Sequence, residues 1–575
     1  MVIAICGYTG QGVETAGAIL SEVLRAKGRR FRTWRDFSTI IRGGLTSFEA
    51  YVDEGAGGEA PARSEAVDVA VVWDEAAAAR YRHRVRDASG WFGAASVEWI
   101  PSGQRESLDS LGFNLWALGV VSCKLGLALA EVERAAQEHF HHPVSLDPLR
   151  RGYERARGGP GASACPPAAA FNPVAIEGTG TDDAVAPPDT VTLSGNDALC
   201  LGALHGGVRI YCGYPITPAS EILEYMMKWL PEVGGRAYQV EDEIAAIHMA
   251  IGASYAGMRT FVATSGPGMD LMTEGLGYVA TIEVPLVVVD NQRGGPSTGM
   301  PTKTEQSDVR HLIHAGHGEF PRVVLAPTGV LDCLQVMQEA LNLADLHQCP
   351  VLVALDLDLA LRRISVPWDR VCEVLERVPV DRGRTLLPPA EVTGYRRFAP
   401  EEGGPVRTVP GVRGGGHVAS GDEHDERGWM EPDFTAVRPS LHRRRLEKVD
   451  HVAYGRPLTV VGSPQAPICL VGTGAFGELI HAAVTLRPDR YRGVMLRQLW
   501  PVPVDAIRRA AAGAETVAVV EYNARGQLAE LVERAISGHR MRSLRRFDGE
   551  HYTVQEFLSA LEGSLAGRAM GEGRA

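Results

Sequence analysis

The sequence predicts an α/β protein made of three α/β domains with mostly parallel sheets. Short apolar runs, each followed at once by a glycine-rich or polar turn, recur in three blocks of the chain. Segments with the helical spacing of apolar residues lie between these runs, so strands and helices alternate, as they do around parallel sheets. The chain has 575 residues, more than one hydrophobic core usually organises, which favours several domains.

The first domain is predicted over residues 1–155. VIAIC (2–6) and VDVAVVWD (67–74) are typical of buried strands, and a helical stripe of apolar residues follows the first of them. We expect these strands to form a parallel sheet. LWALGVVSCKLGLALA (115–130) is almost wholly apolar, which predicts a buried helix. The next stretch is rich in glycine, proline and alanine and has no periodicity, which predicts a linker over 156–190.

The second domain is predicted over 191–375 and the last over 466–575. The strand signals of the second domain are VRIYC (208–212), RTFVAT (259–264) and VPLVVVD (284–290). Those of the last domain are LVGTG and TVAVVEYN, with helices expected to begin at Phe476 and Leu528. Between the two domains, residues 376–465 are rich in glycine, arginine and histidine and poor in periodicity, which indicates an extended arm or insertion.

Charge and cysteine usage narrow the function classes. The chain has 58 basic and 70 acidic residues, a net charge of −12, which argues against binding to nucleic acid or to an anionic membrane surface. Its nine cysteines form no C-x-x-C pair, which argues against zinc or iron–sulfur sites built from local pairs and favours reduced thiols. There is no signal-peptide pattern and no run of 18 apolar residues. We therefore expect a cytoplasmic protein that supplies no metal ligands.

The glycine-rich turn of the first domain has two interpretations. GYTGQG follows a strand and opens a helix, and such a turn permits close approach of a phosphate to a helix N-terminus. Its spacing is G-x-x-G-x-G rather than G-x-G-x-x-G, and no carboxylate clearly ends the next strand to hold a ribose. Packing of helix on strand and binding of a phosphorylated ligand are equally compatible with this turn.

Polar turns follow the strands of the second domain, where parallel sheets place ligand chemistry. In Tyr214-Pro215-Ile216-Thr217-Pro218 the prolines stiffen the turn and fix the direction of the Thr217 hydroxyl. On its own this turn is equally compatible with a plain strand-to-helix connection. Thr264-Ser265-Gly266-Pro267-Gly268 is rich in donors and free of bulk, which suits a flat ligand or an anion.

The longest polar turn follows VPLVVVD and runs from Arg293 to Asp308. It consists mainly of glycine, proline and small polar residues, with one arginine at its root. Arginine presents a planar fork that binds a carboxylate about twice as strongly as a neutral hydrogen bond would. Lys303, further along, is equally compatible with a contact to a second carboxylate and with a solvated position.

In this order and spacing, GYPITPASE, VEDEIAAIHMAIGASYAG, TSGPG and QRGGPSTGMPTKTEQSD resemble the alpha subunit of the 2-oxoacid:ferredoxin oxidoreductases. GYTGQGVETAG is similar to the family's gamma domain, here fused in front, and GDEHDERGWMEPD (421–433) to the segment before its last domain. The likeness covers essentially the whole chain and is greatest to the enzymes that act on 2-oxoglutarate. It implies a thiamine-pyrimidine-binding fold for the second domain and a transketolase C-terminal-like fold for the last.

The resemblance implies an enzyme. Members of the family use thiamine diphosphate to decarboxylate a 2-oxo acid oxidatively, transfer the acyl group to coenzyme A and pass electrons to ferredoxin. For this chain that implies conversion of 2-oxoglutarate to succinyl-CoA and CO2, reversible as reductive carboxylation. Pyruvate and branched-chain 2-oxo acids are alternative substrates. A dinucleotide-dependent dehydrogenase and a non-catalytic scaffold are alternative functions, and the missing ribose carboxylate argues against the dehydrogenase.

The family's functional residues are carried over by motif. The glutamate that contacts the aminopyrimidine falls on Glu243, with Glu241 as the alternative. We expect catalytic roles for Glu243, Thr217 and Arg293. The predicted substrate contacts are Arg293, Thr302, Thr217 and Lys303. The predicted cofactor contacts are Tyr214, Pro215, Glu243, Ser265 and Gly266 for thiamine diphosphate, and Gly10, Gln11 and Gly12 for coenzyme A, with Arg42-Gly43-Gly44 as a second candidate.

The resemblance also implies a second polypeptide. Thiamine enzymes hold the diphosphate through Mg²⁺ with a Gly-Asp-Gly signature, and this sequence contains none. We expect a beta subunit to hold Mg²⁺ and the diphosphate and to carry a [4Fe–4S] cluster, in an (alpha–beta)2 heterotetramer that reduces ferredoxin. The glycines of LVGTGAFGELI in the last domain are assigned to packing and subunit contact in preference to a nucleotide-binding turn.

Overall fold

The computed structural model describes the chain except residues 38–43, 54–63, 65, 95, 98, 101, 109–111, 141, 159–188, 401–404, 451–453, 537 and 567–575. The chain divides into two compact units, one of residues 1–193, 361–371 and 552–557, the other of residues 194–360, 372–551 and 558–575. Most of the predicted linker lies outside the described residues. The second unit contains most of the last two predicted domains, whereas residues 361–371 and 552–557 belong to the first unit. The predicted domain boundaries stay predictions.

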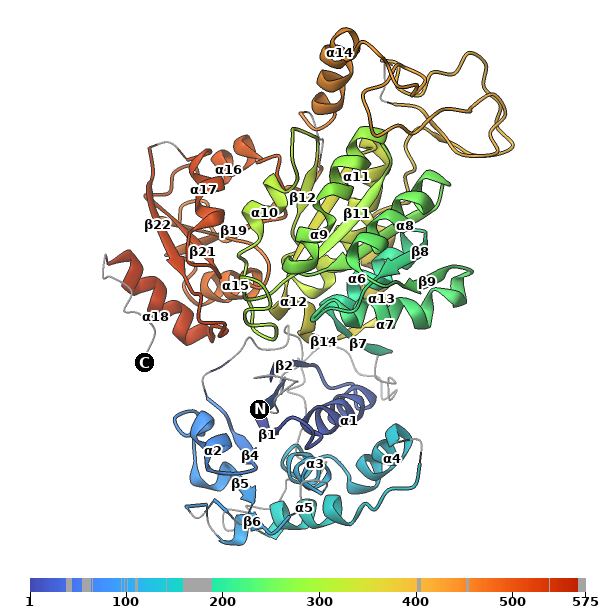
Figure 1. Cartoon of the computed structure of the whole chain (residues 1–575). Coiled ribbons are helices and arrows are strands. Elements are labelled where there is room, and N and C mark those ends of the chain that lie inside the picture. Colours follow the sequence, from blue (N-terminus) through green and yellow to red (C-terminus); the bar gives the residue numbers. More distant parts are fainter. Residues whose placement is uncertain are drawn as a thin grey trace, which may run out of the picture. The chain divides into compact units, whose positions relative to one another are not determined.

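A mixed sheet forms the centre of the first unit, and its strands β1 to β6 are drawn in blue to cyan in Figure 1. Its eight strands in the described residues lie in the order β6 (Arg105–Glu106), β5 (Trp91–Ala94), β4 (Val69–Val72), β1 (Val2–Tyr8), β3 (Leu45–Val52), β2 (Phe31–Phe37), β14 (Arg363–Pro367) and β7 (Thr190–Ser194). From β1 to β6 the neighbours are parallel, whereas β3, β2 and β14 pair antiparallel. The expectation of a parallel sheet is therefore wrong on one side of β1. Because β3 is buried along nearly its whole length, it lacks the alternation that marks an antiparallel strand.

Helices cover both faces of this sheet. α1 (Val13–Ala26), α3 (Phe113–Lys124), α4 (Leu129–Phe140) and α5 (Asp147–Gly158) share a core with Ile3 and Ile5, whereas α2 (Glu75–Tyr81) packs with the alternate residues Ala4 and Cys6. Single turns of 3-10 helix lie at Ala88–Gly90 and Ser102–Gln104. The helix predicted over 115–130 is in fact two helices, because Gly126 adopts a left-handed φ of 70° beyond the end of α3.

A largely parallel sheet forms the centre of the second unit. In the described residues its seven strands lie in the order β20 (Gln498–Trp500), β12 (Val323–Leu325), β13 (Pro350–Asp356), β11 (Leu286–Gln292), β10 (Arg259–Thr264), β8 (Val208–Gly213) and β9 (Arg236–Gln239). Only β20 among these runs antiparallel to its neighbour. The three strands predicted from VRIYC, RTFVAT and VPLVVVD are confirmed as β8, β10 and β11. Since these strands are parallel, the turns that follow them begin at one edge of the sheet.

The helices of this part are α6 (Gly195–His205), α7 (Ser220–Trp229), α8 (Glu243–Tyr255), α9 (Gly266–Ile282), α10 (Val309–His314), α11 (Val330–His347), α12 (Leu357–Leu361) and α13 (Trp368–Glu376), with a 3-10 turn at Pro231–Val233. α8 and α9 share a core with Val262 and Val288 of the sheet. Asn291, at an alternate position of β11, instead bonds to Asn196 of α6. The two faces of β11 therefore meet different helices.

A second sheet in this unit (red, Figure 1) has, within the described residues, the order β17 (Leu458–Val461), β19 (Tyr491–Leu496), β18 (Ile468–Gly472), β21 (Thr516–Glu521) and β22 (Arg540–Arg545). It carries α15 (Phe476–Leu486), α16 (Val504–Ala511), α17 (Gln527–Glu533) and α18 (Val554–Leu565). α15 begins at the predicted Phe476, and α17 begins one residue before the predicted Leu528. One hydrophobic cluster contains Leu352 of the first sheet and Val494 of the second, which explains why both belong to one unit.

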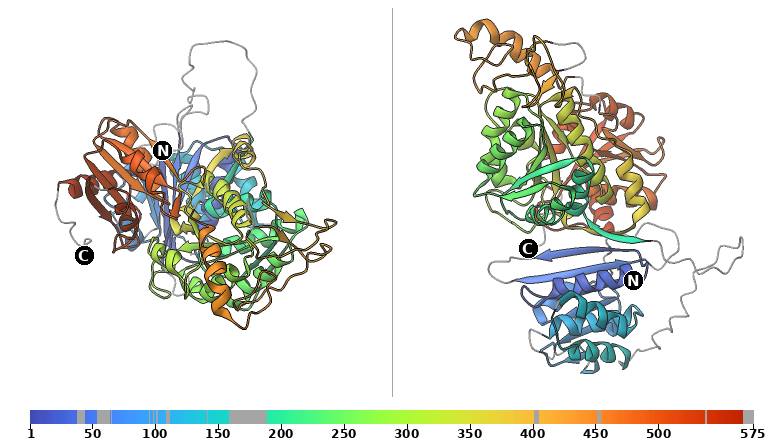
Figure 2. Two further views of the ribbon diagram at one scale, coloured as in Figure 1. Left: turned by 90° about the horizontal axis from the view of Figure 1, so that it is seen from above. Right: turned by 90° about the vertical axis from the view of Figure 1, so that its right-hand side faces the viewer.

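The described residues of 377–400 and 405–433 are largely without regular structure and lead to α14 (Phe434–Glu447), shown in orange in Figures 1 and 2. Within them the structure describes one short parallel pair, β15 (Thr385–Leu386) with β16 (Arg407–Thr408). We call residues 377–447 the arm. So few apolar residues are buried here that polar contacts must contribute to holding it.

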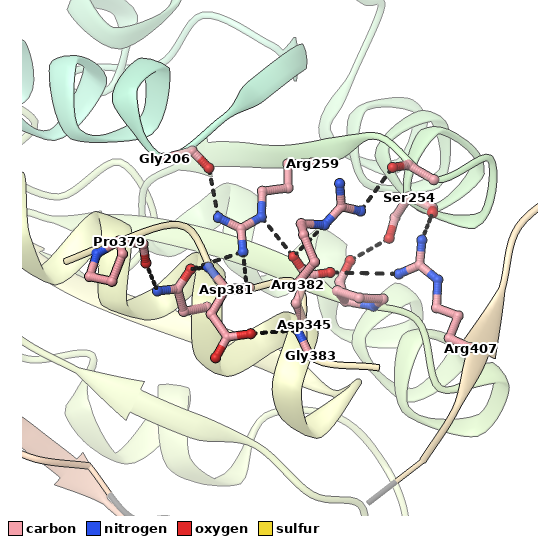
Figure 3. A network of polar contacts seen from close by, with 12 residues as sticks. Gly206, Ser254, Arg259, Asp345, Pro379, Asp381, Arg382, Gly383 and Arg407 are labelled. Atoms are coloured by element: carbon pink, nitrogen blue, oxygen red, sulfur yellow. Dashed lines mark hydrogen bonds and ion pairs between the residues drawn. The ribbon is translucent and has the colours of Figure 1, made fainter. Parts of the chain in front are cut away.

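Asp345 of α11 anchors the arm at one point (Figure 3). Its side chain is 2% exposed, accepts a hydrogen bond from Arg259 Nε at 2.7 Å and lies 3.0 Å from Arg382 Nε of the arm. Arg407 of the arm lies 3.9 Å away and donates to the main-chain oxygen of Ser254 at 2.5 Å. A single buried carboxylate therefore gathers three guanidinium groups, two of them from the arm.

Glu283, between α9 and β11, is a second anchor and is fully buried. Its carboxylate lies 2.5 Å from Lys448 Nζ and contacts the Arg444 guanidinium, while its main-chain oxygen accepts from Arg397 at 2.5 Å. Burial by itself would raise the pKa of Glu283, but Lys448, Arg444 and Arg397 outweigh it and hold the pKa at about 2.

No helix in the described part of the chain is long and apolar enough to cross a membrane.

Candidate active site

The acidic run before α8 separates into three different positions. Asp242 is the N-cap residue, and its side chain accepts a hydrogen bond from the amide of Ala245 at 2.7 Å. Glu241 is exposed, whereas Glu243 is the first residue of the helix and is 6% exposed. A carboxylate at this point is stabilised by the positive end of the helix dipole. Of the two candidate glutamates, the structure buries Glu243.

Gly268 in the first turn of α9 leaves the space that the Glu243 carboxylate occupies. A Cβ atom at position 268 would lie 2.5 Å from Glu243 Oε1 and 2.1 Å from Thr264 Oγ1, so only glycine fits. Ser265, the N-cap residue of α9, is fully buried, and its hydroxyl has no hydrogen-bond partner among the described residues. An orphaned hydroxyl in the turn that meets a buried carboxylate fits a ligand with both donors and acceptors, such as an aminopyrimidine.

Arg293 joins two of the strand-end turns. Its Nη1 donates to the main-chain oxygen of Thr217 at 2.6 Å, which connects the loop after β11 to the turn after β8. The residue is 6% exposed, and its Nε has no hydrogen-bond partner within the described residues. Burial lowers the pKa of Arg293, while Asp290 and Asp308 oppose that shift. The guanidinium remains a cation with a donor still to be satisfied, which suits the recognition of a carboxylate.

Two asparagines support the turn after β8, and sequence reasoning missed both. Asn291 of β11 donates to Asn196 Oδ1 at 3.0 Å, and Asn196 in turn donates to the main-chain oxygen of Pro218 at 3.2 Å. This chain of hydrogen bonds fixes the turn that carries Thr217. Asn196 lies at the start of α6, far away in the sequence, and no local pattern marks it.

The remaining predicted substrate and thiamine contacts differ in exposure. Tyr214 is 38% exposed and Pro215 is also exposed, whereas Thr302 is buried. Lys303 is partly exposed and forms an ion pair, because its Nζ lies 2.8 Å from Glu550 Oε1. Gly266 leaves no room for a side chain, since a Cβ there would lie 2.8 Å from Asp308 Oδ2. The roles assigned to these residues stay predictions.

The far end of the loop after β11 is held by the red sheet. The main-chain amide of Gln306 donates a hydrogen bond to the main-chain oxygen of Tyr522 at 2.6 Å, and Gln306 Oε1 accepts one from the amide of Tyr522 at 3.2 Å. The main-chain oxygen of Gln306 accepts a hydrogen bond from the Asn523 side chain at 3.1 Å. Its side chain also donates to Asp356 Oδ2 at 2.9 Å. The loop is therefore fixed at both ends, at Arg293 and at Gln306, while residues 295–299 between them are exposed.

Two acidic residues near Arg293 were not assigned from the sequence. Asp290, near the end of β11, is fully buried, and among the described residues neither of its carboxylate oxygens has a hydrogen-bond partner. Burial, together with the charges of Asp308 and Asp270, raises the pKa of Asp290 well above its usual value. Burial likewise raises the pKa of Asp308 to about 6. An aspartate that ends a buried apolar run is a signal the sequence did contain.

The predicted coenzyme A contacts belong to the first unit. Gln11 is buried, and its Oε1 accepts a hydrogen bond from the amide of Tyr8 at 2.7 Å. Gly12 is required by close packing, because its φ is 70° and a Cβ there would lie 2.5 Å from Asn114. Gly10 has a φ of 95° and an open surrounding. Packing thus accounts for Gly12 but not for Gly10. Of the second candidate, Arg42 and Gly43 lie outside the described residues.

Comparison with known proteins decides the family. A chain named "2-oxoglutarate synthase subunit KorA" from Methanothermobacter thermautotrophicus is 36% identical over 381 residues, which are 64% of this chain and 97% of that relative. This chain belongs to the 2-oxoacid:ferredoxin oxidoreductase family. The alpha subunit named "2-oxoacid:ferredoxin oxidoreductase 1" from Sulfurisphaera tokodaii is 32% identical over 386 residues, 64% of this chain and 60% of that relative.

Two domain models of the family match separate parts of the chain. Residues 201–369 match "Pyruvate flavodoxin/ferredoxin oxidoreductase, thiamine diP-bdg", and residues 2–154 match "Pyruvate ferredoxin/flavodoxin oxidoreductase". The solved structure of a 2-oxoglutarate:ferredoxin oxidoreductase from Magnetococcus marinus superposes with a TM-score of 0.83 at 28% identity and covers 98% of this chain and 99% of its own. The chain is therefore part of an oxidoreductase, and its strand-end site lies in the family's thiamine-diphosphate-binding domain.

Proposed function

We propose that this chain is the fused gamma–alpha subunit of an enzyme that converts 2-oxoglutarate, coenzyme A and oxidised ferredoxin to succinyl-CoA, CO2 and reduced ferredoxin. A partner beta subunit would hold Mg²⁺ and the diphosphate of thiamine and carry the [4Fe–4S] cluster. The substrate assignment is supported by the names of the relatives from Methanothermobacter and Archaeoglobus and by the 2-oxoglutarate, coenzyme A and succinyl-CoA bound in the Magnetococcus structure.

The observation that carries the proposal is that Glu243 and Arg293 both lie at the edge of the sheet where its parallel strands end. Glu243 follows β9 and, together with Thr264 at the end of β10, borders the space beside Gly268, while Arg293 follows β11, which pairs with β10 in parallel. Thiamine diphosphate, when bound, supplies the electron sink for decarboxylation. The Glu243 carboxylate would hold and release a proton toward the aminopyrimidine, a contribution of about 10²–10⁴ in rate. Arg293, positioned by the Thr217 oxygen, would bind the substrate carboxylate.

The decisive experiment compares two glutamates two residues apart. The chain is produced together with its partner subunit, and coenzyme A-dependent reduction of a low-potential dye by 2-oxoglutarate is measured. Glu243→Gln is expected to lower kcat at least about 100-fold because the amide cannot exchange the proton. Glu241→Gln is the matched control, since this side chain is exposed, and near wild-type turnover is expected. Full turnover in Glu243→Gln would refute the role of Glu243.

The substrate is tested with the same complex. Pyruvate, a branched-chain 2-oxo acid and 2-oxoglutarate are compared by kcat/KM under identical conditions. We expect the highest value for 2-oxoglutarate. A higher value for either of the other acids would leave the family assignment intact and refute the substrate assignment.

A further inference from the structure

Asp290 occupies a position that the proposed chemistry does not use. It is in register with Thr264 of β10 and Ala354 of β13, so on its face of the sheet it has one hydroxyl and one methyl group as strand neighbours. Its side chain is fully buried, and neither carboxylate oxygen has a hydrogen-bond partner among the described residues. An ionised carboxylate in such a place would be desolvated without compensation, whereas the protonated acid is tolerated.

The charges around Asp290 come from three elements. Asp270 belongs to α9, Asp308 is the residue that precedes α10, and Arg293 stands at the root of the loop. The register neighbours on β10 and β13 carry no charge. Two carboxylates thus oppose ionisation of Asp290, and one guanidinium favours it. Burial is the largest influence, and the balance keeps the pKa of Asp290 far above its usual value.

The protonation state of Asp290 affects the net charge around the Arg293 guanidinium. Asp308 also acts on Arg293, and because it is partly exposed whereas Asp290 is fully buried, ionisation costs Asp308 less than Asp290. The first negative charge near the guanidinium therefore lies on Asp308. A second, on Asp290, would make the surroundings of Arg293 negative overall and repel an incoming carboxylate.

We propose that Asp290 is a positioning residue for Arg293: it holds a proton, and the positive charge of the guanidinium thereby remains available to a substrate carboxylate. The kinetic part of this inference rests on the proposed role of Arg293 in binding substrate. The protonation part does not, and it is tested without turnover.

Infrared spectroscopy of the complex with its partner subunit tests the proton directly. The wild-type complex is expected to show the C=O stretch of a protonated carboxyl group at neutral pH, and the difference spectrum against Asp290→Asn is expected to assign it. The difference is needed because burial also raises the pKa of Asp356 and of Glu521. Absence of the band in the wild type, or its persistence at full intensity in Asp290→Asn, would overturn the proposal.

Asp308→Asn provides a second variant that does not depend on the folding of Asp290→Asn. Removing a neighbouring negative charge makes ionisation of Asp290 easier, so the infrared band is expected to disappear at lower pH than in the wild type. An Asp290 that is merely a buried packing residue, without electrostatic contact to the site, would lose its band at the same pH in both proteins, and that result would overturn the proposal.

The kinetic readout is the pH dependence of KM for the 2-oxo acid. In the wild type, ionisation of Asp290 at alkaline pH is expected to raise KM about tenfold, as an added negative charge near the binding arginine would. In Asp290→Asn this rise is expected to vanish, while the exposed control Asp489→Asn retains it. The same rise in Asp290→Asn as in the wild type would overturn the proposal. If no 2-oxo acid is turned over, the proposed function fails, and the infrared experiment still decides whether Asp290 holds a proton.

Discussion

Glu283 lies just before β11 and Asp290 lies near the carboxyl end of this strand, and their surroundings shift the pKa values of the two carboxyl groups in opposite directions. Both are fully buried carboxylates. Glu283, before the strand, meets Lys448, Arg444 and Arg397, which hold its pKa at about 2 despite burial. Asp290, near the end of the strand, has no hydrogen-bond partner among the described residues, and burial raises its pKa.

The two ends of β11 therefore differ in role: ion pairs at the amino end hold the structure together, and the carboxyl end belongs to the candidate active site. At the amino end of β11 the buried Glu283 carboxylate is paired with cations, and these ion pairs attach the arm to the sheet, as those around Asp345 also do. At the carboxyl end polar atoms of Ser265, Asp290 and Arg293 are buried without partners in the described residues. Unpaired buried groups cost stability, and a folded protein retains them where a ligand or a proton supplies what is missing.

The largest effect on stability is expected at the amino end of β11, where Glu283 is paired with cations. Glu283→Gln would leave Lys448 and Arg444 buried without a counter-charge, so we expect the free energy of unfolding to fall by about 3–5 kcal/mol. Urea denaturation of the chain measures this. The exposed Glu232→Gln is the control and is expected to change stability by less than about 0.5 kcal/mol. A loss as small in Glu283→Gln as in the control would show that the cations do not need this carboxylate.

A smaller effect, of a different kind, is expected at the unpaired end. Arg293→Met removes the proposed substrate contact, and hydrogen bonds to charged groups contribute about 1.5–3 kcal/mol. We therefore expect kcat/KM for 2-oxoglutarate to fall about 10- to 100-fold, mainly through KM, with less loss of stability than in Glu283→Gln. Steady-state kinetics of the complex measures this. Arg310→Met, which removes an exposed arginine paired with Glu530, is the control. Equal kcat/KM values in both variants would argue against the role of Arg293.

The smallest effect is expected in how the free energy of unfolding depends on pH, because Glu283 and Asp290 contribute to it with opposite signs. Because the folded pKa of Glu283 is about 2, below its ordinary value of 4.5, its contribution to stability is complete above pH 4.5 and is lost as the pH falls toward 2. The folded pKa of Asp290 is raised above 3.8, so its contribution is complete below that pH and is lost as the pH rises.

Unfolding free energies measured against pH test these two signs. Relative to the wild type, Glu283→Gln is expected to lose less stability as the pH falls below 4.5, and Asp290→Asn less as the pH rises above 3.8, each by at most about 1.4 kcal/mol per pH unit. Curves that shift in the same direction for both variants would contradict the contrast between the two ends of β11.

Much of the site could be predicted from the sequence because its signals are local. A turn that follows an apolar run, as at Thr217 or Arg293, is placed at a strand end once the strand is recognised, and family motifs mark which residues matter. The family motif favoured Glu243 over Glu241, but the sequence did not show that only Glu243 is buried. Their difference depends on Gly268 and Thr264, which approach from another part of the chain. The two asparagines that support the Thr217 turn were missed for the same reason.

By itself the sequence determined the α/β class, the segments that form the strands carrying the site, and the family. The tertiary structure alone decided which carboxylates are paired. Arg382 and Arg407 reach Asp345 from the arm, and Lys448 reaches Glu283 from beyond α14. Such pairings depend on distances between residues far apart in the chain, and the charge of a buried group depends on those pairings because water no longer screens it.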